Sequence, residues 1–295
     1  MSSPSSSTSK WPIVLYIPNL MCYLRIILAF IGLYYSLLQQ QITTPQGTIT
    51  IRIATSTDTE ATQHNPSPDV ILKAIYIWLF SQSLDFFDGI IARKLNQCSN
   101  VGILLDIIAD NILRTTTWIA AIIISSASLC ISDTSNPSTS SFFFFGGAYY
   151  NIIIIIVGTF IICIEWITLL CTQLHSKEGG GKHWKSNREN DPWFIRQVFK
   201  NNFKNPLGSL VLYGLYGSSL FVYGSNYYIL YNHIPYFDLL KYTAYIGRCL
   251  AMFVEVYLCS NYFQLQLQIS SVKEKEDEDE TTTTTTTTDN NKKKE

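Results

Sequence analysis

The sequence has few charged residues and few of the side chains that usually bind transition metals. Only 15% of its 295 residues are charged, against about 25% in a typical soluble domain. Thirteen of its 43 charges lie in residues 273–295, and the formal net charge of −1 does not indicate a nucleic-acid-binding protein. Four histidines, and seven cysteines without Cys-x-x-Cys spacing, argue against a zinc site. This composition excludes a disordered chain and argues against an ordinary soluble domain.

Long apolar runs, in contrast, are abundant. Six segments are each long enough to cross a bilayer core, which takes roughly 20 helical residues. They are residues 13–38, 70–92, 101–131, 142–172, 206–231 and 236–266. We therefore expect an all-α integral membrane protein, a bundle of six transmembrane helices with polar, disordered tails.

The tails and the apolar body divide the chain into three expected regions. We expect residues 1–11 to be a disordered cytosolic N-terminus and residues 12–268 to form the six-helix membrane domain. Residues 269–295 predict a disordered cytosolic tail, because a charged and threonine-rich segment has little apolar surface to bury.

The charges in the connections predict how the helices are oriented. Residues 39–69 contain one arginine and three acids, whereas residues 173–205 contain seven lysines and arginines against three acids. Arg93 and Lys94 add two cations after the second span. Since cationic loops remain on the cytosolic side, we expect both termini and the cationic loops to face the cytosol.

Four aspartates interrupt the second and third spans: Asp85, Asp88, Asp106 and Asp110. An acid at the centre of a membrane helix costs about 2.5–3.5 kcal/mol on insertion scales, so four require an offsetting interaction. A structural hydrogen bond explains a single intramembrane acid more easily than it explains four at this spacing. The aspartates are therefore candidate functional residues.

The spacing of these acids places them on shared helix faces. Asp85 and Asp88 are three residues apart, and Gly89 and Ala92 lie on the same face with almost no side chain. Such a flat face lets a ligand approach the backbone. In the next span Gly102, Asp106, Asp110 and Arg114 follow one another at intervals of four residues and form one row.

The short connection between these two spans predicts that they are antiparallel neighbours whose acid pairs face each other near the cytosolic surface. Carboxylate oxygens without His or Cys suit Mg²⁺, Mn²⁺ or Ca²⁺, and two divalent ions would balance four carboxylates. Arg93, at the end of the second span, adds a cation suited to phosphate. Metal-assisted phosphoryl transfer at a lipid interface is the leading hypothesis.

The same residues form a known signature. The chain reads Asp85-Phe86-Phe87-Asp88-Gly89-Ile90-Ile91-Ala92-Arg93, then Gly102, Asp106 and Asp110 after gaps of eight, three and three residues. This pattern resembles that of the CDP-alcohol phosphatidyltransferase family, six-helix integral membrane enzymes. Two finer stretches are similar to the phosphatidylinositol synthase subfamily: Pro18-Asn19-Leu20-Met21-Cys22-Tyr23-Leu24-Arg25, and Ala92-Arg93-Lys94-Leu95-Asn96-Gln97-Cys98-Ser99-Asn100-Val101-Gly102-Ile103-Leu104-Leu105-Asp106.

The resemblance implies an activity and a role for each matching residue. Asp85, Asp88, Asp106 and Asp110 would hold two divalent ions, Mg²⁺ or Mn²⁺, and Asp110 would also be the catalytic base. CDP-diacylglycerol would bind at Gly89, Ala92, Arg93, Ser99 and Gly102. The reaction would transfer the phosphatidyl group to myo-inositol and release CMP. A homodimer in the endoplasmic reticulum membrane is also implied.

The sequence departs from the subfamily pattern at two positions. Asn111 stands where an arginine usually follows the last aspartate, and Arg114 is a candidate replacement for that cation. Glu165 stands where an aspartate is expected in the fourth span. Candidate residues for the acceptor alcohol are Glu165, His183, Lys185 and Arg196.

Several alternatives remain open from the sequence. A sister enzyme of the same family would use glycerol 3-phosphate or serine as the acceptor. A transporter or channel would line an ion path with the acids, and a catalytically inactive relative would act as a scaffold. Arg25 has two readings: it reaches the site if the first helix unwinds near Pro18, or it extends to the membrane surface.

Overall fold

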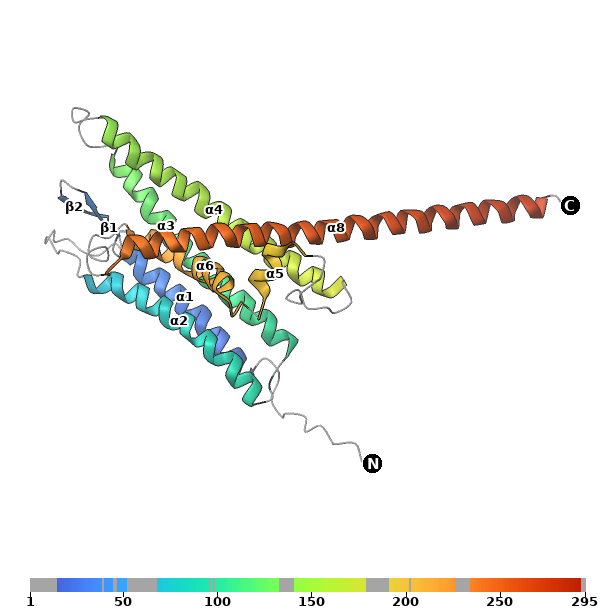
Figure 1. Cartoon of the computed structure of the whole chain (residues 1–295), viewed down its shortest axis with the longest axis horizontal. Helices are drawn as coiled ribbons and strands as arrows, with labels where there is room; N and C mark the ends of the chain where they lie inside the picture. Colours follow the sequence, from blue (N-terminus) through green and yellow to red (C-terminus); the bar gives the residue numbers. More distant parts are fainter. Residues whose placement is uncertain are drawn as a thin grey trace, which may run out of the picture.

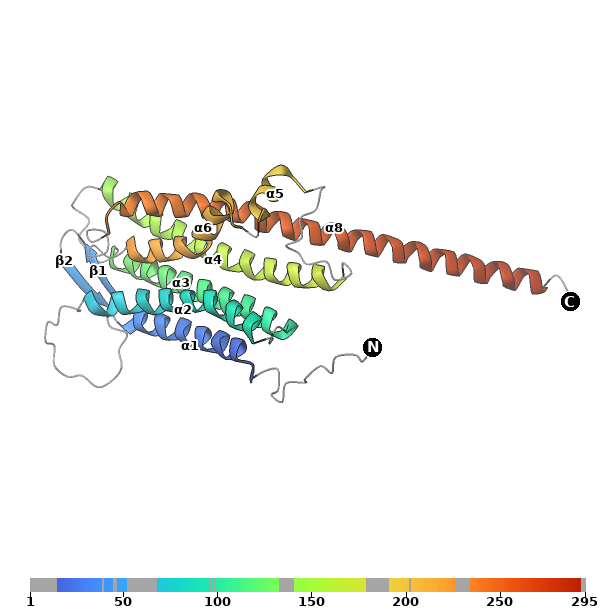
Figure 2. The ribbon, with the colours of Figure 1, turned by 60° about the horizontal axis from the view of Figure 1, so that its bottom comes forward.

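The computed structural model describes residues 15–38, 40–44, 47–51, 68–95, 97, 99–132, 141–178, 191–201, 203–225 and 234–292. These residues form seven helices and one pair of strands. The elements are α1 (Ile17–Leu38), β1 (Gln40–Thr44), β2 (Gly47–Ile51), α2 (Pro68–Lys94), α3 (Asn100–Ser132), α4 (Ser141–Glu178), α5 (Trp193–Phe199), α6 (Pro206–Ser225) and α8 (Phe237–Lys292). The long helices run side by side, and α8 projects far beyond the others (Figures 1 and 2).

Four of the described helices are long and apolar enough to cross a membrane: α1, α3, α4 and α6. They indicate a multi-pass membrane protein and confirm the helical architecture. Helices α2 and α8 carry more charged side chains than α1, whose single charge is Arg25. The crossing of the bilayer by α2 and α8, and so the total of six spans, stays a prediction.

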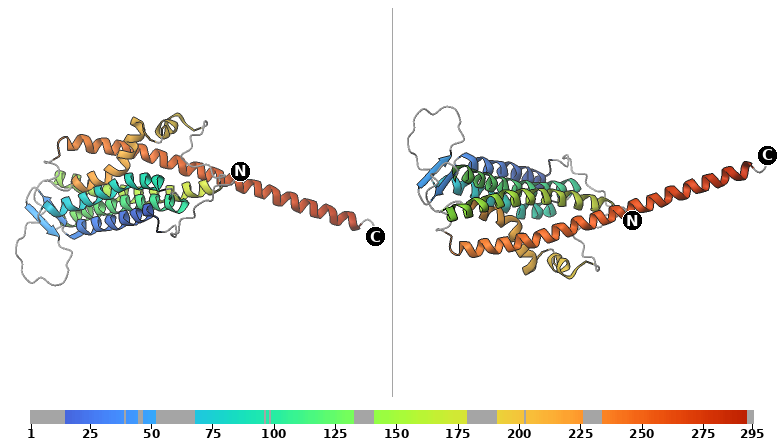
Figure 3. Two further views of the ribbon diagram at one scale, coloured as in Figure 1. Left: turned by 90° about the horizontal axis from the view of Figure 1, so that it is seen from below. Right: turned by 90° about the horizontal axis from the view of Figure 1, so that it is seen from above.

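Two segments differ from the sequence-based expectation. The first lies in the connection between the first two spans, for which no secondary structure was predicted: β1 and β2 form an antiparallel pair in which Ile42 lies opposite Ile49. Both strands are rich in threonine and isoleucine, whose branched side chains favour extended backbone. The strand pair lies at the end of the bundle opposite to the projecting part of α8 (Figure 3).

The second difference concerns the expected tail. Helix α8 is continuous over 56 residues and reaches Lys292, whereas we expected residues 269–295 to lack regular structure. At about 1.5 Å per residue this helix is roughly 84 Å long, well beyond a bilayer core of about 30 Å. The lysine and glutamate residues of 273–280 are good helix formers and favour continuation of the helix there, whereas the eight threonines that follow have low helix propensity. The division into three regions stays a prediction.

Close packing of α1 against α2 depends on small residues in α1. Trp78 of α2 donates its indole N–H to the carbonyl oxygen of Ala29 at 3.2 Å, and Ser81 donates to the carbonyl of Arg25 at 3.1 Å. A Cβ on Gly32 would collide with the Trp78 ring. Small residues thus let the two backbones approach closely, as membrane helices often do.

Close packing through glycine also joins α6 to α8. Gly214 of α6 lies so close to α8 that a Cβ would meet the backbone of Gly247 and Arg248. Helix α6 is also tied to α3, because the hydroxyls of Thr117 and Ser219 are 2.7 Å apart. These contacts fix α6 beside the end of α3 that carries the acids.

The connection between α2 and α3 also holds the start of α1. Ser99 caps α3 by accepting a hydrogen bond from the Gly102 backbone N–H at 3.0 Å. Gln97 accepts one from the Ile17 N–H at 3.1 Å, which satisfies an N–H group at the start of α1. The signature segment therefore also positions the first helix.

Candidate metal centre

Four carboxylates from α2 and α3 converge on one guanidinium group from α1. Nη1 of Arg25 lies 2.9 Å from Asp85, 3.1 Å from Asp88 and 2.6 Å from Asp106, and Nη2 pairs with Asp110. The Arg25 side chain has no exposed surface, while the side chains of Asp85 and Asp106 are 33% and 40% exposed. The site is closed on the α1 side and accessible at the acids.

Arg25 reaches the acids in a way that neither sequence-based reading described. Helix α1 is regular from Ile17 onward with Pro18 in its first turn, so it does not unwind there, and Arg25 is buried rather than extended to the surface. Helix α1 packs extensively against both α2 and α3, which contact each other much less. The acids of α2 and α3 face each other as expected, but the contribution of α1, whose Arg25 lies between them, was not predicted.

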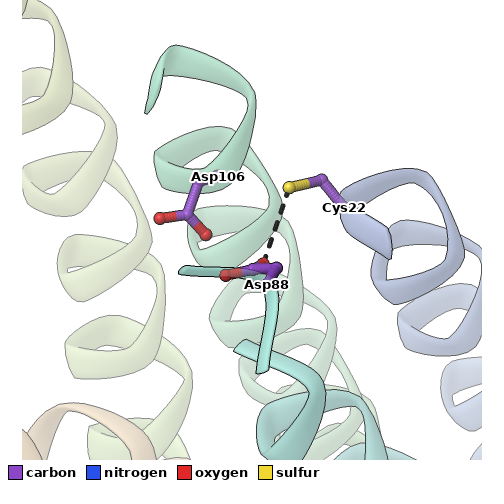
Figure 4. Close-up of side chains that lie close together, drawn as sticks. All are labelled: Cys22, Asp88 and Asp106. Atoms are coloured by element: carbon purple, nitrogen blue, oxygen red, sulfur yellow. Dashed lines mark hydrogen bonds between the residues drawn. The ribbon is translucent and has the colours of Figure 1, made fainter. Parts of the chain in front are cut away.

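The acids form two overlapping groups whose ligand atoms lie within 4.8 Å of one another: Asp85 with Asp106 and Asp110, and Asp88 with Asp106 and Cys22. Figure 4 shows the second group, with the Cys22 thiol pointing to Asp88 at 3.7 Å. We expected no cysteine at the site. The sequence feature that could have indicated Cys22 is its interval of three residues from Arg25, which puts both on one face of α1.

The donor set fits divalent cations that prefer oxygen ligands. Four carboxylates face a single guanidinium, which leaves an excess of three negative charges. Arg25 occupies the position of a cation between the acids, and a positive group there satisfies all four. Carboxylate oxygens at this spacing suit Mg²⁺ or Mn²⁺ better than zinc.

The glycines of the signature differ in what surrounds them. A Cβ on Gly102 would lie 2.8 Å from the Asn19 Oδ1 atom, so this glycine serves the approach of α1 to α3. A Cβ on Gly89 would meet, among the described residues, only the guanidinium of Arg93, at 3.6 Å. Arg93 is exposed and Ala92 is half-buried. The face of α2 near Gly89 is therefore open to a ligand, with a cation beside it.

A second charged cluster lies deeper in the bundle, between α3, α4 and α8. Glu165 pairs with Arg114 at 3.2 Å and with Arg248 at 3.4 Å, and Arg248 also pairs with Glu255 at 2.9 Å. Two arginines balance two glutamates. Arg114 is therefore bound to Glu165, and Asn111 accepts a hydrogen bond from Arg114 and donates to the Glu165 carbonyl. Sequence analysis did not select Arg248 and Glu255, although both are charges within an apolar span.

Of the acceptor candidates other than Glu165, the structure describes only Arg196. Arg196 is exposed on α5, and it does not line either of the two cavities described below. His183 and Lys185 lie outside the described residues. Of the two candidates that the structure describes, Glu165 lines a cavity that reaches the acids, whereas Arg196 does not.

Two cavities reach the acid cluster from different sides. One of about 630 Å³ lies between α2, α3 and α6, is lined mainly by apolar side chains, and reaches Asp85. The other, of about 220 Å³, lies between α3, α4, α6 and α8 and reaches Asp106 and Asp110, with Glu165 in its wall. The side chains of Arg114, Leu212 and Tyr216 line both. The site thus joins an apolar cavity to a smaller one that contains more polar groups.

These features define a multi-pass helical membrane protein with a cluster of acids between α1, α2 and α3 that is fitted to divalent cations and open to two cavities. A model of the CDP-alcohol phosphatidyltransferase family matches residues 15–182, more than half of the chain, and the chain belongs to this family. Such enzymes transfer a phosphatidyl group from a CDP-alcohol and generally use divalent metals. The comparisons with curated proteins and with solved structures gave no match.

Proposed function

We propose that the protein is a CDP-diacylglycerol–inositol phosphatidyltransferase, which converts CDP-diacylglycerol and myo-inositol to phosphatidylinositol and CMP. The observation that carries the phosphatidyl transfer is the convergence of the four signature aspartates on one point between α1, α2 and α3. The choice of inositol rests on the finer sequence similarities around residues 18–25 and 92–106.

Asp85, Asp88, Asp106 and Asp110 would hold two divalent ions, Mg²⁺ or Mn²⁺. When bound, these ions supply positive charge that neutralises the pyrophosphate and stabilises CMP as it leaves. The carboxylates need such a partner because one arginine leaves three of their charges unbalanced.

The protein's own residues divide the remaining tasks. Gly89 and Ala92 leave space for the donor nucleotide against the α2 backbone, and the Arg93 guanidinium contacts a phosphate oxygen. Gly102 and Ser99 hold the start of α3 at the correct distance from α1. These residues orient the donor so that the acceptor attacks the phosphorus that bears the lipid.

Asp110 takes the proton of the attacking hydroxyl group at a carboxylate oxygen. It lines the smaller cavity together with Glu165. At about 220 Å³ this cavity is below the usual range of about 300–1,000 Å³ for drug-sized ligands, so it suits a small polar acceptor. The apolar cavity of about 630 Å³ suits a hydrocarbon chain of the donor.

The placement of the enzyme in the cell is part of the proposal. Cationic connections after α2 and α4 support a cytosolic site and cytosolic termini. The subfamily resemblance supports a homodimer in the endoplasmic reticulum membrane. His183, Lys185 and Arg196 remain acceptor candidates through the same cationic connection.

The test is the acceptor preference of purified protein. The enzyme is incubated with CDP-diacylglycerol, Mg²⁺ or Mn²⁺, and labelled inositol, glycerol 3-phosphate or serine in separate reactions. We expect label in lipid with inositol only, together with an equal amount of CMP. Incorporation of glycerol 3-phosphate or serine instead would assign the protein to a sister activity. Absence of nucleotide-dependent transfer with all three would contradict the enzyme and favour a transporter or scaffold.

A further inference from the structure

Tyr216 is the side chain on which the two cavities and the two charged clusters meet. Its hydroxyl donates a hydrogen bond to Asp110 Oδ2 at 2.7 Å, on the opposite carboxylate oxygen from the one that faces Arg25. Its ring lies 5.2 Å from the guanidinium carbon of Arg114. Arg114 is itself held by Glu165. The Tyr216 side chain is therefore held at its hydroxyl by Asp110 and at its ring by Arg114.

The position of Tyr216 on α6 is independently constrained. Gly214, two residues earlier, packs against the backbone of α8 without room for a Cβ. Ser219, three residues later, lies 2.7 Å from Thr117 of α3. Helix α6 is thus held at both sides of Tyr216, and the tyrosine side chain must point to the interface of the two cavities.

The two cavities contain different acids and share only part of their walls. Asp85 lines only the apolar cavity, whereas Asp106 and Asp110 line only the smaller one. The residues shared by both are Arg114, Leu212 and Tyr216. Among these three, only Tyr216 is hydrogen-bonded to one of the acids. Loss of its ring would connect the two spaces beside the reacting phosphorus.

We propose that Tyr216 is a positioning residue that aims Asp110 at the acceptor and separates the acceptor cavity from the lipid cavity, so that the alcohol rather than water attacks the donor. This inference rests on the proposed phosphatidyl transfer. The Tyr216 hydroxyl would orient Asp110, the proposed base, and the Tyr216 ring would keep water away from the donor.

The competing reaction defines what the partition prevents. A water oxygen forms a bond to the phosphorus that bears the lipid, and the bond from that phosphorus to the bridging oxygen breaks. CMP leaves with the electron pair, the water proton passes to Asp110 and then to solvent, and the lipid product is phosphatidic acid. Transfer and hydrolysis both release CMP, so only the lipid product separates them.

The experiment uses the purified full-length chain with CDP-diacylglycerol in detergent micelles. CMP release and both lipid products are measured with and without acceptor. Tyr216→Phe keeps the ring and loses the hydroxyl, so we expect kcat about tenfold lower, with the acceptor KM and the hydrolysed fraction within twofold of the unmodified enzyme. Tyr216→Ala loses the ring, so we expect the hydrolysed fraction to rise about tenfold.

Tyr257→Phe is the matched control, since the Tyr257 hydroxyl donates a similar hydrogen bond to Asp191, at 2.9 Å, and Tyr257 lines neither of the two cavities. It should change neither kcat nor the hydrolysed fraction. If Tyr216→Ala does not fold, Tyr216→Leu provides the same readout. An unchanged kcat in Tyr216→Phe overturns the role of the hydroxyl, and an unchanged hydrolysed fraction in Tyr216→Ala or Tyr216→Leu overturns the partition. Failure of the unmodified enzyme to release CMP with any acceptor would contradict the proposed function instead.

Discussion

The bundle contains two buried charged clusters that differ in their balance of charge. Around Arg25, four aspartates face one arginine. Around Glu165, two glutamates face two arginines, Arg114 and Arg248. The first cluster needs an additional cation and is partly exposed, whereas the second is neutral and almost fully buried. The difference separates a site that binds a ligand from a network that joins helices.

The largest expected effect is on activity, in the acid-rich cluster. Asp110→Asn removes the proposed base, and general base catalysis typically contributes about 10²–10⁴-fold, so CMP release should fall at least about 100-fold. The free energy of unfolding should stay the same or rise, because one of three unbalanced negative charges is removed. Asp238→Asn, in the partly exposed pair with Lys241, is the control and should change activity not at all and stability by less than about 1 kcal/mol. Near-normal turnover of Asp110→Asn would remove this residue as the base.

The neutral cluster should respond in the opposite way, with a loss of stability. Arg248→Met leaves Glu255 buried without its partner, and breaking a buried ion pair costs about 3–5 kcal/mol. The double variant Arg248→Met with Glu255→Leu should recover most of this loss, because Glu165 keeps Arg114. Chemical denaturation in detergent measures both. Equal stability of the single variant and the natural sequence would show that the network does not join the helices.

The third effect distinguishes the clusters by their response to metal ions. Mg²⁺ or Mn²⁺ at 100 times its Kd should stabilise the protein by about 2.7 kcal/mol. Arg25→Met should be less stable than the natural sequence without metal, and should gain more from the ions, because four carboxylates then lack any counter-charge. Thermal unfolding with and without the ions provides the measurement. Arg93→Met, at an exposed arginine, is the control and should unfold like the natural sequence in both conditions.

The smallest effect compares two glycines. Gly214→Ala places a methyl group against the α8 backbone and should destabilise the protein by about 1–3 kcal/mol. Gly89→Ala has space for the methyl group, so its stability should change by less than about 1 kcal/mol, while the KM for CDP-diacylglycerol rises. Thermal unfolding and donor titration measure the two properties. An unchanged KM in Gly89→Ala would argue against nucleotide binding on this face of α2.

The sequence predicted the parts of the site that depend on spacing along one helix. Asp106 and Asp110 share a face of α3 as their interval required, and the expected helical segments form helices. It predicted that the acids of the second and third spans face each other, but not the contacts that other helices make with them. Cys22, Tyr216 and Arg248 join the site or its supports only through packing of α1, α6 and α8. No local pattern indicates which helix lies opposite another, because many arrangements bury the same apolar faces.

The strand pair and the length of α8 were missed for a different reason. Residues 40–51 were considered only as part of a connection and for its charges, although their threonine and isoleucine content favours strands. The charged stretch of α8 was predicted to be disordered because it has little apolar surface to bury. A lack of apolar surface does not prevent a segment rich in lysine and glutamate from forming a helix.

The burial of Arg25 has a consequence for biogenesis. Helix α1 leaves the ribosome before α2 and α3, so it enters the translocon with an arginine whose four partners have not yet been synthesised. An arginine at the centre of a lone membrane helix costs about 2.5–3.5 kcal/mol on insertion scales. Pairing with the acids of α2 and α3 offsets this cost, so the stability of α1 in the bilayer should increase once the next two helices have arrived.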